Sequence, residues 1–351
     1  MKPVIRQYYD IKKEKWDDFV YNTKGGYAYH LYDVIALDRW INDKNKSFCI
    51  VNEENDEIVL IAMLHLEKRI TEEEEYYRLH SRWGYVMADN LTLREQRKIC
   101  DAYKQYIDNW FSKYDIRVFD AEMPPLRENN MPGMMDGINP LMILGFSPKI
   151  RYTWIVDISK PEEQLLANCE QTTRQAIRKL KQSERYMIYE AGNLEEEYKI
   201  YQHLHEETYT RTGATDCIIY EEYNRNIFFN LIPQKRCRVF FLKDIQTEEV
   251  IAANVILLYK NSAYYWWGAS VSQKEVGINK LLLWEAMLAV RKNYRSHPDM
   301  QYPVMFPEKF YFETGGAYPY LRDGKNKGLN DFKKCFGCQL HPIFTGEYVK
   351  P

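Results

Sequence analysis

Apolar and polar positions recur along the chain with two periods, which divide it into predicted helices and strands. A recurrence every three to four residues predicts helices over 12–22, 34–40, 94–114, 194–212, 220–232 and 277–292. Strict alternation or short apolar runs predict strands over 47–52, 58–66, 116–120, 152–157, 237–243, 250–259, 262–269, 309–314 and 343–349. Helices and strands are thus interspersed along the whole chain, which predicts an α/β (α+β) fold.

The segment after residue 157 predicts one long amphipathic helix. Ser159 is the expected N-cap, and Pro161 stands in the first turn. The buried stripe is expected to consist of Leu165, Cys169, Thr173, Ala176 and Leu180. Arg174 and Arg178 then lie on the flanks or the outer face of this helix.

The last fifty residues carry the most distinctive local pattern. The predicted strand 309–314 runs into a turn-rich segment, 315–327, and then into a short helix. This helix carries Phe332 and Phe336 on one face, with Lys333 beside them. A strand, a glycine-rich loop and a helix with a lysine can hold an anion or stabilise developing negative charge. A solvated amphipathic helix is the alternative interpretation of the same residues.

Composition narrows the possible partners. The chain has 351 residues, enough for two domains of ordinary size. Lys and Arg number 48 against 50 Asp and Glu, so a nucleic-acid partner would need a local basic patch. Seven scattered cysteines, an N-terminus without an apolar leader and the lack of any run of eighteen apolar residues favour a cytoplasmic protein with reduced thiols. The single Cys335–Cys338 pair predicts no metal site, since it lacks a second pair.

The C-terminal pattern resembles a known family signature. Phe-Glu-Thr-Gly-Gly over 312–316, followed by Gly-Leu-x-x-Phe-Lys-x-x-Phe-Gly over 328–337, is similar to that of the FemAB family. Those enzymes transfer aminoacyl groups to peptidoglycan precursors and belong to the superfamily built on the GNAT acetyltransferase fold. The resemblance is strongest from 152 to 340 and weaker before it.

The resemblance implies a specific domain organisation. We expect two GNAT-like domains in tandem, each a mixed, largely antiparallel sheet flanked by helices, with no coiled-coil arm. The first domain would span 1–149 and the second 150–340, with 341–351 returning to the body as a terminal strand.

The resemblance also implies roles for individual residues. Lys333 would lie beside the reaction centre as a catalytic residue, with Phe332 lining the site. Arg211, in the Glu-Thr-x-x-Arg-x-Gly pattern of 207–213, would meet the acceptor, although it could instead neutralise a helix C-terminus. The remaining residues expected to bind substrate are Arg39, Arg174, Arg178 and one of the pair Tyr264 and Tyr265.

The donor is predicted from the loop before the helix 277–292. Proteins of the GNAT type that bind CoA hold its pyrophosphate on a loop with two glycines at a helix start. Here Gly277 remains, and Asn279 stands at the second place, where a left-handed Asn could keep the turn. Both residues would bind cofactor only if CoA is the donor, and the altered loop favours another donor.

The sequence therefore predicts an N-acyltransferase. The first hypothesis is aminoacyl transfer from aminoacyl-tRNA to an amine of a peptidoglycan precursor, by direct attack without a covalent intermediate and without a tightly bound cofactor. Contact with a membrane surface would follow if the acceptor is lipid-linked. One alternative is acetyl-CoA-dependent acylation of an amino sugar or peptide amine, and another is a binding protein that has lost catalysis. Glu206 or Glu313 could serve as general base, and the sequence does not rank them.

Overall fold

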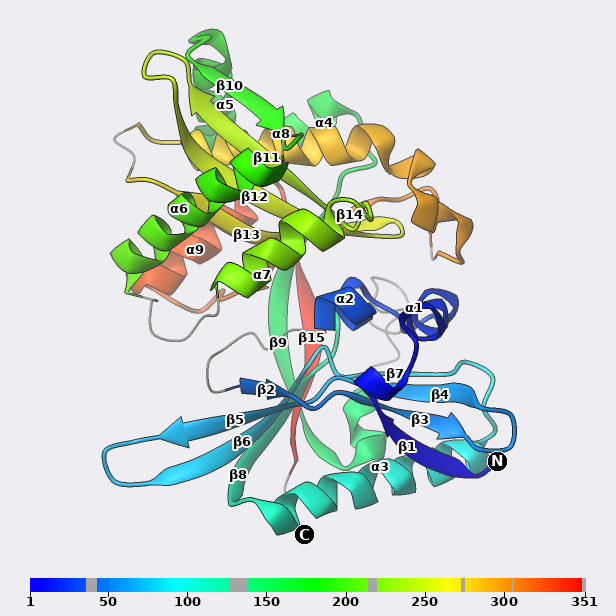
Figure 1. Ribbon diagram of the computed structural model, residues 1–351. Coiled ribbons are helices and arrows are strands. Elements are labelled where there is room, and N and C mark those ends of the chain that lie inside the picture. The colour runs from blue at the N-terminus through cyan, green and yellow to red at the C-terminus, as the bar shows by residue number, and fades with distance from the viewer. Residues whose placement is uncertain are drawn as a thin grey trace. The chain divides into compact units, whose positions relative to one another are not determined.

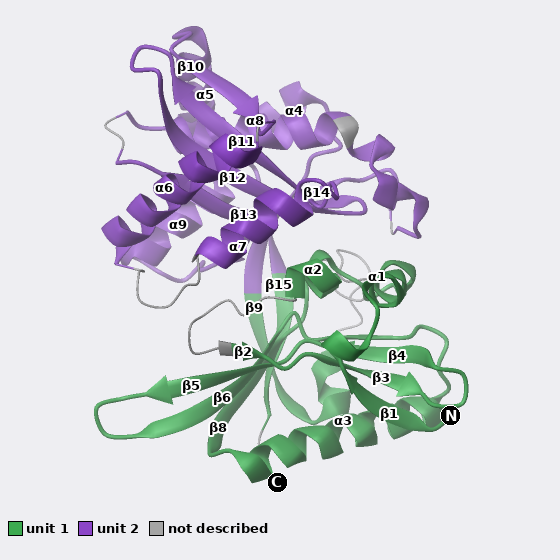
Figure 2. Ribbon diagram, viewed as in Figure 1, with its two compact units in different colours: residues 1–151, 342–351 green, residues 152–341 purple. Residues whose placement is uncertain are grey.

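The structure, a computed structural model, describes residues 1–35, 43–125, 138–192, 194–213, 220–272, 275–304 and 306–348 (Figure 1). The chain divides into two compact units, residues 1–151 with 342–351 and residues 152–341 (Figure 2). The expected domain limits at 149 and 340 stay predictions, because compactness alone does not show that each part folds independently.

Unit 1, residues 1–151 with 342–351, begins with the N-terminus. Its helices are α1 (Lys13–Asn22), α2 (Tyr32–Ile35) and α3 (Leu93–Lys113). Its strands are β1 (Pro3–Gln7), β2 (Asp43–Asn45), β3 (Phe48–Asn52), β4 (Glu57–Ala62), β5 (His65–Ile70), β6 (Glu75–Arg82), β7 (Tyr85–Met87) and β8 (Ile116–Glu122). Strands β9 (Phe146–Asp157) and β15 (Gln339–Tyr348) begin in one unit and end in the other.

The strands of unit 1 form two groups. Strands β1, β3, β4 and β7 lie side by side in that order and pair antiparallel. Strand β6 pairs antiparallel with β5 and parallel with β8, while β15 pairs antiparallel with β8. Helix α3 contributes Ile99, Tyr103 and Ile107 to the buried core. The predicted amphipathic helix at 94–114 is therefore confirmed.

Unit 2, residues 152–341, contains most of the predicted helices. They are α4 (Glu162–Asn168), α5 (Gln171–Gln182), α6 (Leu194–Thr212), α7 (Tyr220–Asn226), α8 (Ile278–Asn293) and α9 (Gly324–Lys334). A π-helical turn, η5 (Ile227–Leu231), continues α7, and short 3-10 turns, η6 (Tyr294–Ser296) and η7 (Pro298–Gln301), follow α8. Its remaining strands are β10 (Tyr186–Glu190), β11 (Cys237–Asp244), β12 (Glu249–Tyr259), β13 (Ser262–Ser270) and β14 (Tyr311–Ala317).

The sheet of unit 2 has the order β10-β11-β12-β13-β14-β9. All neighbours pair antiparallel except β13 and β14, which are parallel. Helix α6 crosses the face toward the viewer in Figure 1, and α8 packs against the sheet from behind. Residues of α5, α8 and the strands share one core, which includes Trp284 and Phe312. This is the mixed, largely antiparallel sheet expected of a GNAT-like half, and no coiled-coil arm occurs in the described parts of either unit.

Four local predictions are corrected. The helix expected from Ser159 is two helices, α4 and α5, and Pro161 rather than Ser159 is the N-cap. Ser159 instead donates its N–H and hydroxyl to Asp157, as is common in tight turns. The buried stripe also shifts after the break at Cys169. Ile177 is buried, whereas Ala176 was expected to be. The strand predicted over 58–66 is divided between β4 and β5.

Candidate active site

The parallel strands β13 and β14 separate after a short common stretch. They are in register only from Ser262↔Tyr311 to Tyr264↔Glu313. Beyond Tyr264, strand β13 continues to Ser270, and β14 continues to Ala317, without pairing with each other. Along these segments the two strands do not hydrogen-bond to each other. We call this opening the strand gap.

A glycine of β14 brings Lys333 to the strand gap. The register of β14 against β9 shifts between Glu313 and Gly315, and Gly315 has a φ of 101°. A Cβ atom on Gly315 would lie 2.9 Å from Lys333 Nζ, so the end of the lysine side chain would have to move if another residue stood here. Lys333 Nζ lies 3.5 Å from the carbonyl oxygen of Gly316, to which it donates. The Gly-Gly of the family signature thus forms the surface on which the lysine rests.

Hydrogen bonds fix helix α9 over this strand. The side-chain oxygen of Asn330 accepts from Trp154 Nε1 at 2.9 Å and from the backbone N–H of Tyr318 at 2.8 Å. Thr314 donates its hydroxyl to the carbonyl oxygen of Lys333 at 2.9 Å. Because Asn330 and the backbone of Lys333 are both held, the lysine approaches the strand gap from a fixed position.

The electrostatics of Lys333 set it apart from the neighbouring lysines. Burial lowers the pKa of the Lys333 ammonium from its ordinary value, and the carboxylate of Glu313 partly opposes that shift. Glu313 is only 7% exposed, and it accepts a hydrogen bond from Thr153 Oγ1 at 2.7 Å. A desolvated ammonium close to a buried carboxylate is typical of functional sites.

The two tyrosines of β13 have different environments. Tyr264 is buried in the core, where its hydroxyl lies 2.7 Å from Ser262 Oγ. Tyr265 contacts Phe332 instead, with 6.1 Å between ring centroids, and burial raises the pKa of its hydroxyl. That hydroxyl covers Gly268, since a Cβ there would lie 1.8 Å from it. Of the two predicted candidates, the structure therefore brings only Tyr265 together with Phe332.

A buried amide lies on the same face and was missed by sequence reasoning. Asn254 of β12 pairs directly with Gly268 of β13, so its side chain points to the face that carries Tyr265. Asn254 is 3% exposed, and its Nδ2 has no hydrogen-bond partner in the described part of the chain. A buried amide without a partner is costly, which makes it a candidate donor to a bound substrate.

Hydrogen bonds join the C-terminal turn of α6 to the end of β13. Arg211 donates from Nη2 to the carbonyl oxygen of Ser270 at 2.9 Å. Thr208 donates its hydroxyl to the same oxygen at 3.0 Å and accepts from the Ser270 N–H at 2.8 Å. In this structure Arg211 thus positions the strand end, and a contact of Arg211 with an acceptor stays a prediction.

The start of α8 departs from the predicted loop. Gly277 is its N-cap with a φ of 103°, whereas Asn279 lies inside the helix, so the idea that a left-handed Asn keeps the turn is wrong. Asn279 Nδ2 donates to Ser270 Oγ at 3.4 Å. A Cβ on Gly277 would lie 2.8 Å from the Ala176 side chain, so this glycine allows α8 to approach α5 closely. No side chain caps the helix.

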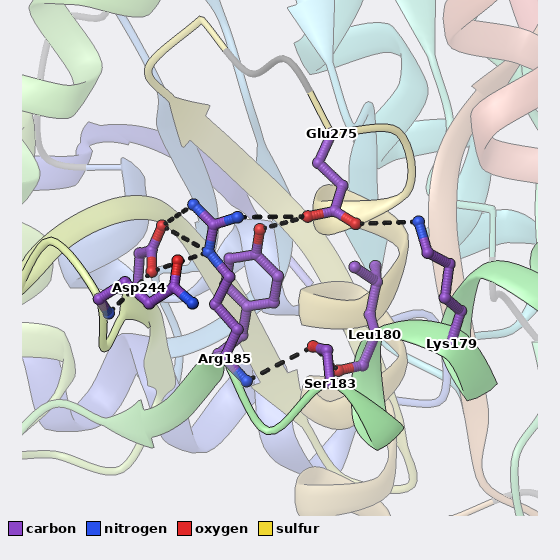
Figure 3. A network of polar contacts seen from close by, with 8 residues as sticks. Lys179, Leu180, Ser183, Arg185, Asp244 and Glu275 are labelled. Carbon is purple, nitrogen blue, oxygen red and sulfur yellow. Dashed lines mark hydrogen bonds and ion pairs between the residues drawn. The ribbon is translucent and has the colours of Figure 1, made fainter.

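A carboxylate network surrounds the loop before α8 (Figure 3). Glu275 accepts from the Tyr186 hydroxyl at 2.6 Å and from Lys179 Nζ at 3.2 Å. The hydrogen bonds from Tyr186 and Lys179 lower the pKa of Glu275, which stays ionised. Arg185 lies beside them and binds both carboxylate oxygens of Asp244. Lys179 and Arg185 are therefore already engaged by carboxylates.

The remaining predicted residues are not joined to the strand gap by any described contact. Arg174 donates to the carbonyl oxygen of Ala167 at 3.0 Å and to that of Cys169, closing the turn between α4 and α5. Arg178 is exposed on α5, and Arg39 lies outside the described residues. Cys335 is a buried free thiol, and no cluster of three metal-ligating side chains occurs in the described ranges.

Comparison with known proteins supports the fold. Residues 167–311 match the family described as "Acetyltransferase (GNAT) domain". The crystal structure of FemX is 16% identical with a TM-score of 0.66, covering 100% of this chain and 98% of the other. A tandem GNAT protein from the clavulanic acid biosynthesis pathway is 10% identical with a TM-score of 0.53, and the alignment covers 99% of each chain. No curated protein matches by sequence.

A third solved structure is also similar to this chain. It is the C-terminal domain of a putative lysylphosphatidylglycerol synthetase from Agrobacterium fabrum, 11% identical with a TM-score of 0.57, covering 96% of this chain and 91% of the other. Fold class and resemblance are thereby confirmed: the chain has the tandem GNAT-like fold shared with FemX, a fold found in acyltransferases. None of the described helices is long and apolar enough to cross a membrane.

Proposed function

We propose that the protein is an N-acyltransferase of FemAB type, which moves an aminoacyl group from aminoacyl-tRNA to an amine of a peptidoglycan precursor. The observation that carries the proposal is the partly buried ammonium of Lys333, held against Gly315 and Gly316 where β13 and β14 separate. The fold shared with FemX supports it. We further infer that the protein acts in the cytoplasm, where both proposed substrates are made available.

The proposed reaction needs orientation and charge stabilisation rather than a covalent intermediate. The acceptor amine attacks the acyl carbon of the donor, forming a C–N bond as the ester C–O bond breaks. Lys333 would stabilise the negative charge that develops on the carbonyl oxygen. Glu313 would take the proton from the attacking amine, and the leaving hydroxyl of the tRNA would receive a proton in turn. Phe332 and Tyr265 would exclude water around the acyl group.

The surroundings of α8 favour a donor other than CoA. A pyrophosphate bound at the start of α8 would lie close to the ionised carboxylate of Glu275. The nearby cations Lys179 and Arg185 already pair with carboxylates, so they offer little compensation. A tRNA, in contrast, can distribute its phosphates over a larger surface.

The second candidate function, acyl transfer from acetyl-CoA, is favoured by a different observation. Helix α8 starts at Gly277, which has a left-handed φ and no side chain to cap the helix, an arrangement in which helix N–H groups can bind an anion. Under this alternative, Gly277 and Asn279 would hold the cofactor, and an amino sugar or peptide amine would be the acceptor.

A direct competition of donors tests the proposal. Purified protein is presented with charged tRNA or acetyl-CoA, and binding and transfer to a peptidoglycan-precursor amine are measured. We expect retention of charged tRNA, with an affinity that falls by about tenfold or more between low and moderate salt because phosphate contacts release counterions. Binding of acetyl-CoA with a flat salt response would replace this proposal by the second candidate. Binding of tRNA and acceptor without turnover would indicate a binding protein.

A further inference from the structure

An exposed loop of unit 2 joins β14 to α9. It comprises residues 318–323, all of them exposed, and we call it the aromatic loop. Tyr320 is 82% exposed and Tyr318 is 45% exposed. Neighbouring exposed tyrosines offer flat, amphipathic rings, which are typical of surfaces that bind another molecule. The aromatic loop is therefore a candidate binding surface.

The aromatic loop begins at the strand gap. Tyr318 follows Gly316 by two residues, and a Cβ atom on Gly316 would lie 3.9 Å from the Tyr318 hydroxyl. The carbonyl oxygen of Gly316 in turn accepts from Lys333 Nζ at 3.5 Å. A molecule whose reacting carbon lies at Lys333 therefore has the ring of Tyr318 within reach.

Backbone hydrogen bonds order the aromatic loop. The Tyr318 N–H donates to Asn330 Oδ1 at 2.8 Å. The Leu321 N–H donates to the carbonyl oxygen of Tyr318 at 3.2 Å and closes a turn, in which Pro319 has a fixed φ. Because the backbone is already ordered, a ligand that binds the rings loses less free energy in ordering the loop.

Two cations next to the rings have no carboxylate partner within the described ranges. Arg322 is exposed and makes no ion pair there. Lys325, in the first turn of α9, donates to the carbonyl oxygen of Thr212 at 3.2 Å, which leaves its charge without a counter-charge. Asp323 is the one carboxylate of the aromatic loop, so the two cations outnumber it. Flat rings beside unpaired cations are the combination that binds single-stranded nucleic acid.

We propose that the aromatic loop binds the single-stranded 3′ end of the donor RNA. Tyr318 and Tyr320 stack on its last bases, and Arg322 and Lys325 bind the phosphates between them. The assignment rests on the proposed function, because the acyl group of an aminoacyl-tRNA is esterified to the terminal ribose. An acyl carbon at Lys333 consequently brings the last base to the Tyr318 side of the strand gap. A CoA nucleotide, in contrast, would lie at the start of α8.

Filter retention of two RNA probes tests the stacking. One probe is a hairpin of the tRNA acceptor stem with its single-stranded 3′ end, and the other is the same hairpin cut blunt. The wild type should prefer the first about tenfold or more, because only unpaired bases can stack on the rings. Tyr320→Ala should remove most of that preference, and Tyr320→Phe should retain it within about twofold, since the ring is kept. Tyr9→Ala is the matched control, because Tyr9 is 65% exposed in unit 1. Equal loss in Tyr320→Ala and Tyr9→Ala, or no loss in either, would contradict the assignment.

Salt dependence tests the phosphate contacts. Arg322→Gln and Lys325→Gln should each lower the slope of log affinity against log salt by about 0.7, the value for one phosphate contact on a single strand. Arg97→Gln is the control, since Arg97 is an exposed cation of α3 in unit 1, and it should leave the slope unchanged. Unchanged slopes in all three variants would refute the contact of Arg322 and Lys325 with phosphates.

Transfer from the charged hairpin separates the role of the loop from the proposed function. Tyr320→Ala should raise KM about tenfold and leave kcat within about twofold, because Tyr320 does not touch the reacting atoms. Transfer by the wild type with an unchanged KM in this variant would refute the role of the loop and leave the aminoacyl transferase standing. A wild type that neither retains nor uses either hairpin would overturn both.

Vesicles of phosphatidylglycerol test a membrane as the occupant of the same surface. We expect the wild type and Tyr320→Ala to sediment with them equally. Sedimentation of the wild type but not of Tyr320→Ala, together with equal RNA affinity in the two proteins, would assign the aromatic loop to a lipid surface and overturn the proposal.

Discussion

Each unit contains one parallel pair of strands, and the two pairs behave differently. In unit 1, β6 and β8 stay paired from Tyr77↔Ile116 to Arg82↔Glu122, with one register shift between Tyr77 and Arg78. Arg78 reinforces this pair by donating to Asp120 at 2.7 Å across the two strands. In unit 2, β13 and β14 separate after Tyr264↔Glu313. The same architecture therefore yields a closed sheet in one unit and a strand gap in the other.

The N-terminal turns of α3 in unit 1 and α8 in unit 2 also differ. Helix α3 of unit 1 has a complete capping box, in which Thr92 accepts from the Glu95 N–H and Glu95 accepts from the Thr92 N–H. Its first turn is thus satisfied within the chain. Helix α8 of unit 2 starts at Gly277 without any side-chain cap. These two helix starts therefore differ in whether a side chain of the chain itself serves the first turn.

The largest effect is expected for Lys333→Met. Transfer should fall about 10²–10³-fold, as for loss of one group that stabilises an oxyanion. Arg78→Met, at the closed pair of unit 1, should leave transfer within about twofold while costing roughly 0.5–1 kcal/mol of folding free energy. Single-turnover rates and urea unfolding of both variants measure the contrast. Equal loss of transfer in the two variants would erase the distinction between the units.

A smaller effect is expected for Gly315→Ala. The left-handed φ of 101° and the approach of Lys333 should together cost about 2 kcal/mol of folding free energy and reduce transfer by displacing the lysine. Gly324→Ala is the matched control, because Gly324 also has positive φ but open space around it, so it should cost only about 1 kcal/mol. Urea unfolding compares the two. Identical costs would show that the lysine does not press on the strand.

The smallest effect is in the pH profile. Because the pKa of Lys333 is lowered below 10.5, transfer should decline as pH rises through that lowered value. The free energy of unfolding should rise with pH between the lowered pKa and 10.5, because over that range the unfolded chain binds more protons than the folded one. Lys333→Arg should shift the decline to higher pH. A decline at the same pH in that variant would assign it to another group.

Sequence reasoning predicted the elements with a strong period and a local cause. Helices α3, α6 and α8 follow from helical periodicity, and strands β11, β12 and β13 from short apolar runs, which β12 buries on both faces. It did not predict the break between α4 and α5. At that break, Arg174 donates a hydrogen bond to the carbonyl oxygen of Cys169, several residues earlier in the chain, and so closes the turn. Such a contact depends on geometry that no local pattern contains.

The residues of the candidate site also divide into those that the sequence predicted and those that only the structure revealed. Lys333 and Phe332 were predicted from the resemblance of the 312–337 pattern to the FemAB signature, whereas the local pattern alone also fits a solvated amphipathic helix. Tyr265 could be chosen over Tyr264 only from the structure, and Asn254 had no sequence signal at all. Asn254 becomes notable because it pairs with Gly268, and strand pairing joins residues that are distant in the sequence.

The sequence by itself determined most of the helices and strands, through local periodicity. The tandem GNAT-like class and the choice of Lys333 came from the resemblance of the C-terminal pattern to the FemAB signature. The tertiary structure decided where β13 and β14 separate and which groups share the strand gap. The physical reason is that burial, desolvation and strand register arise only when distant segments pack together. Desolvation lowers the pKa of Lys333. Strand register decides which partners a buried polar group can reach.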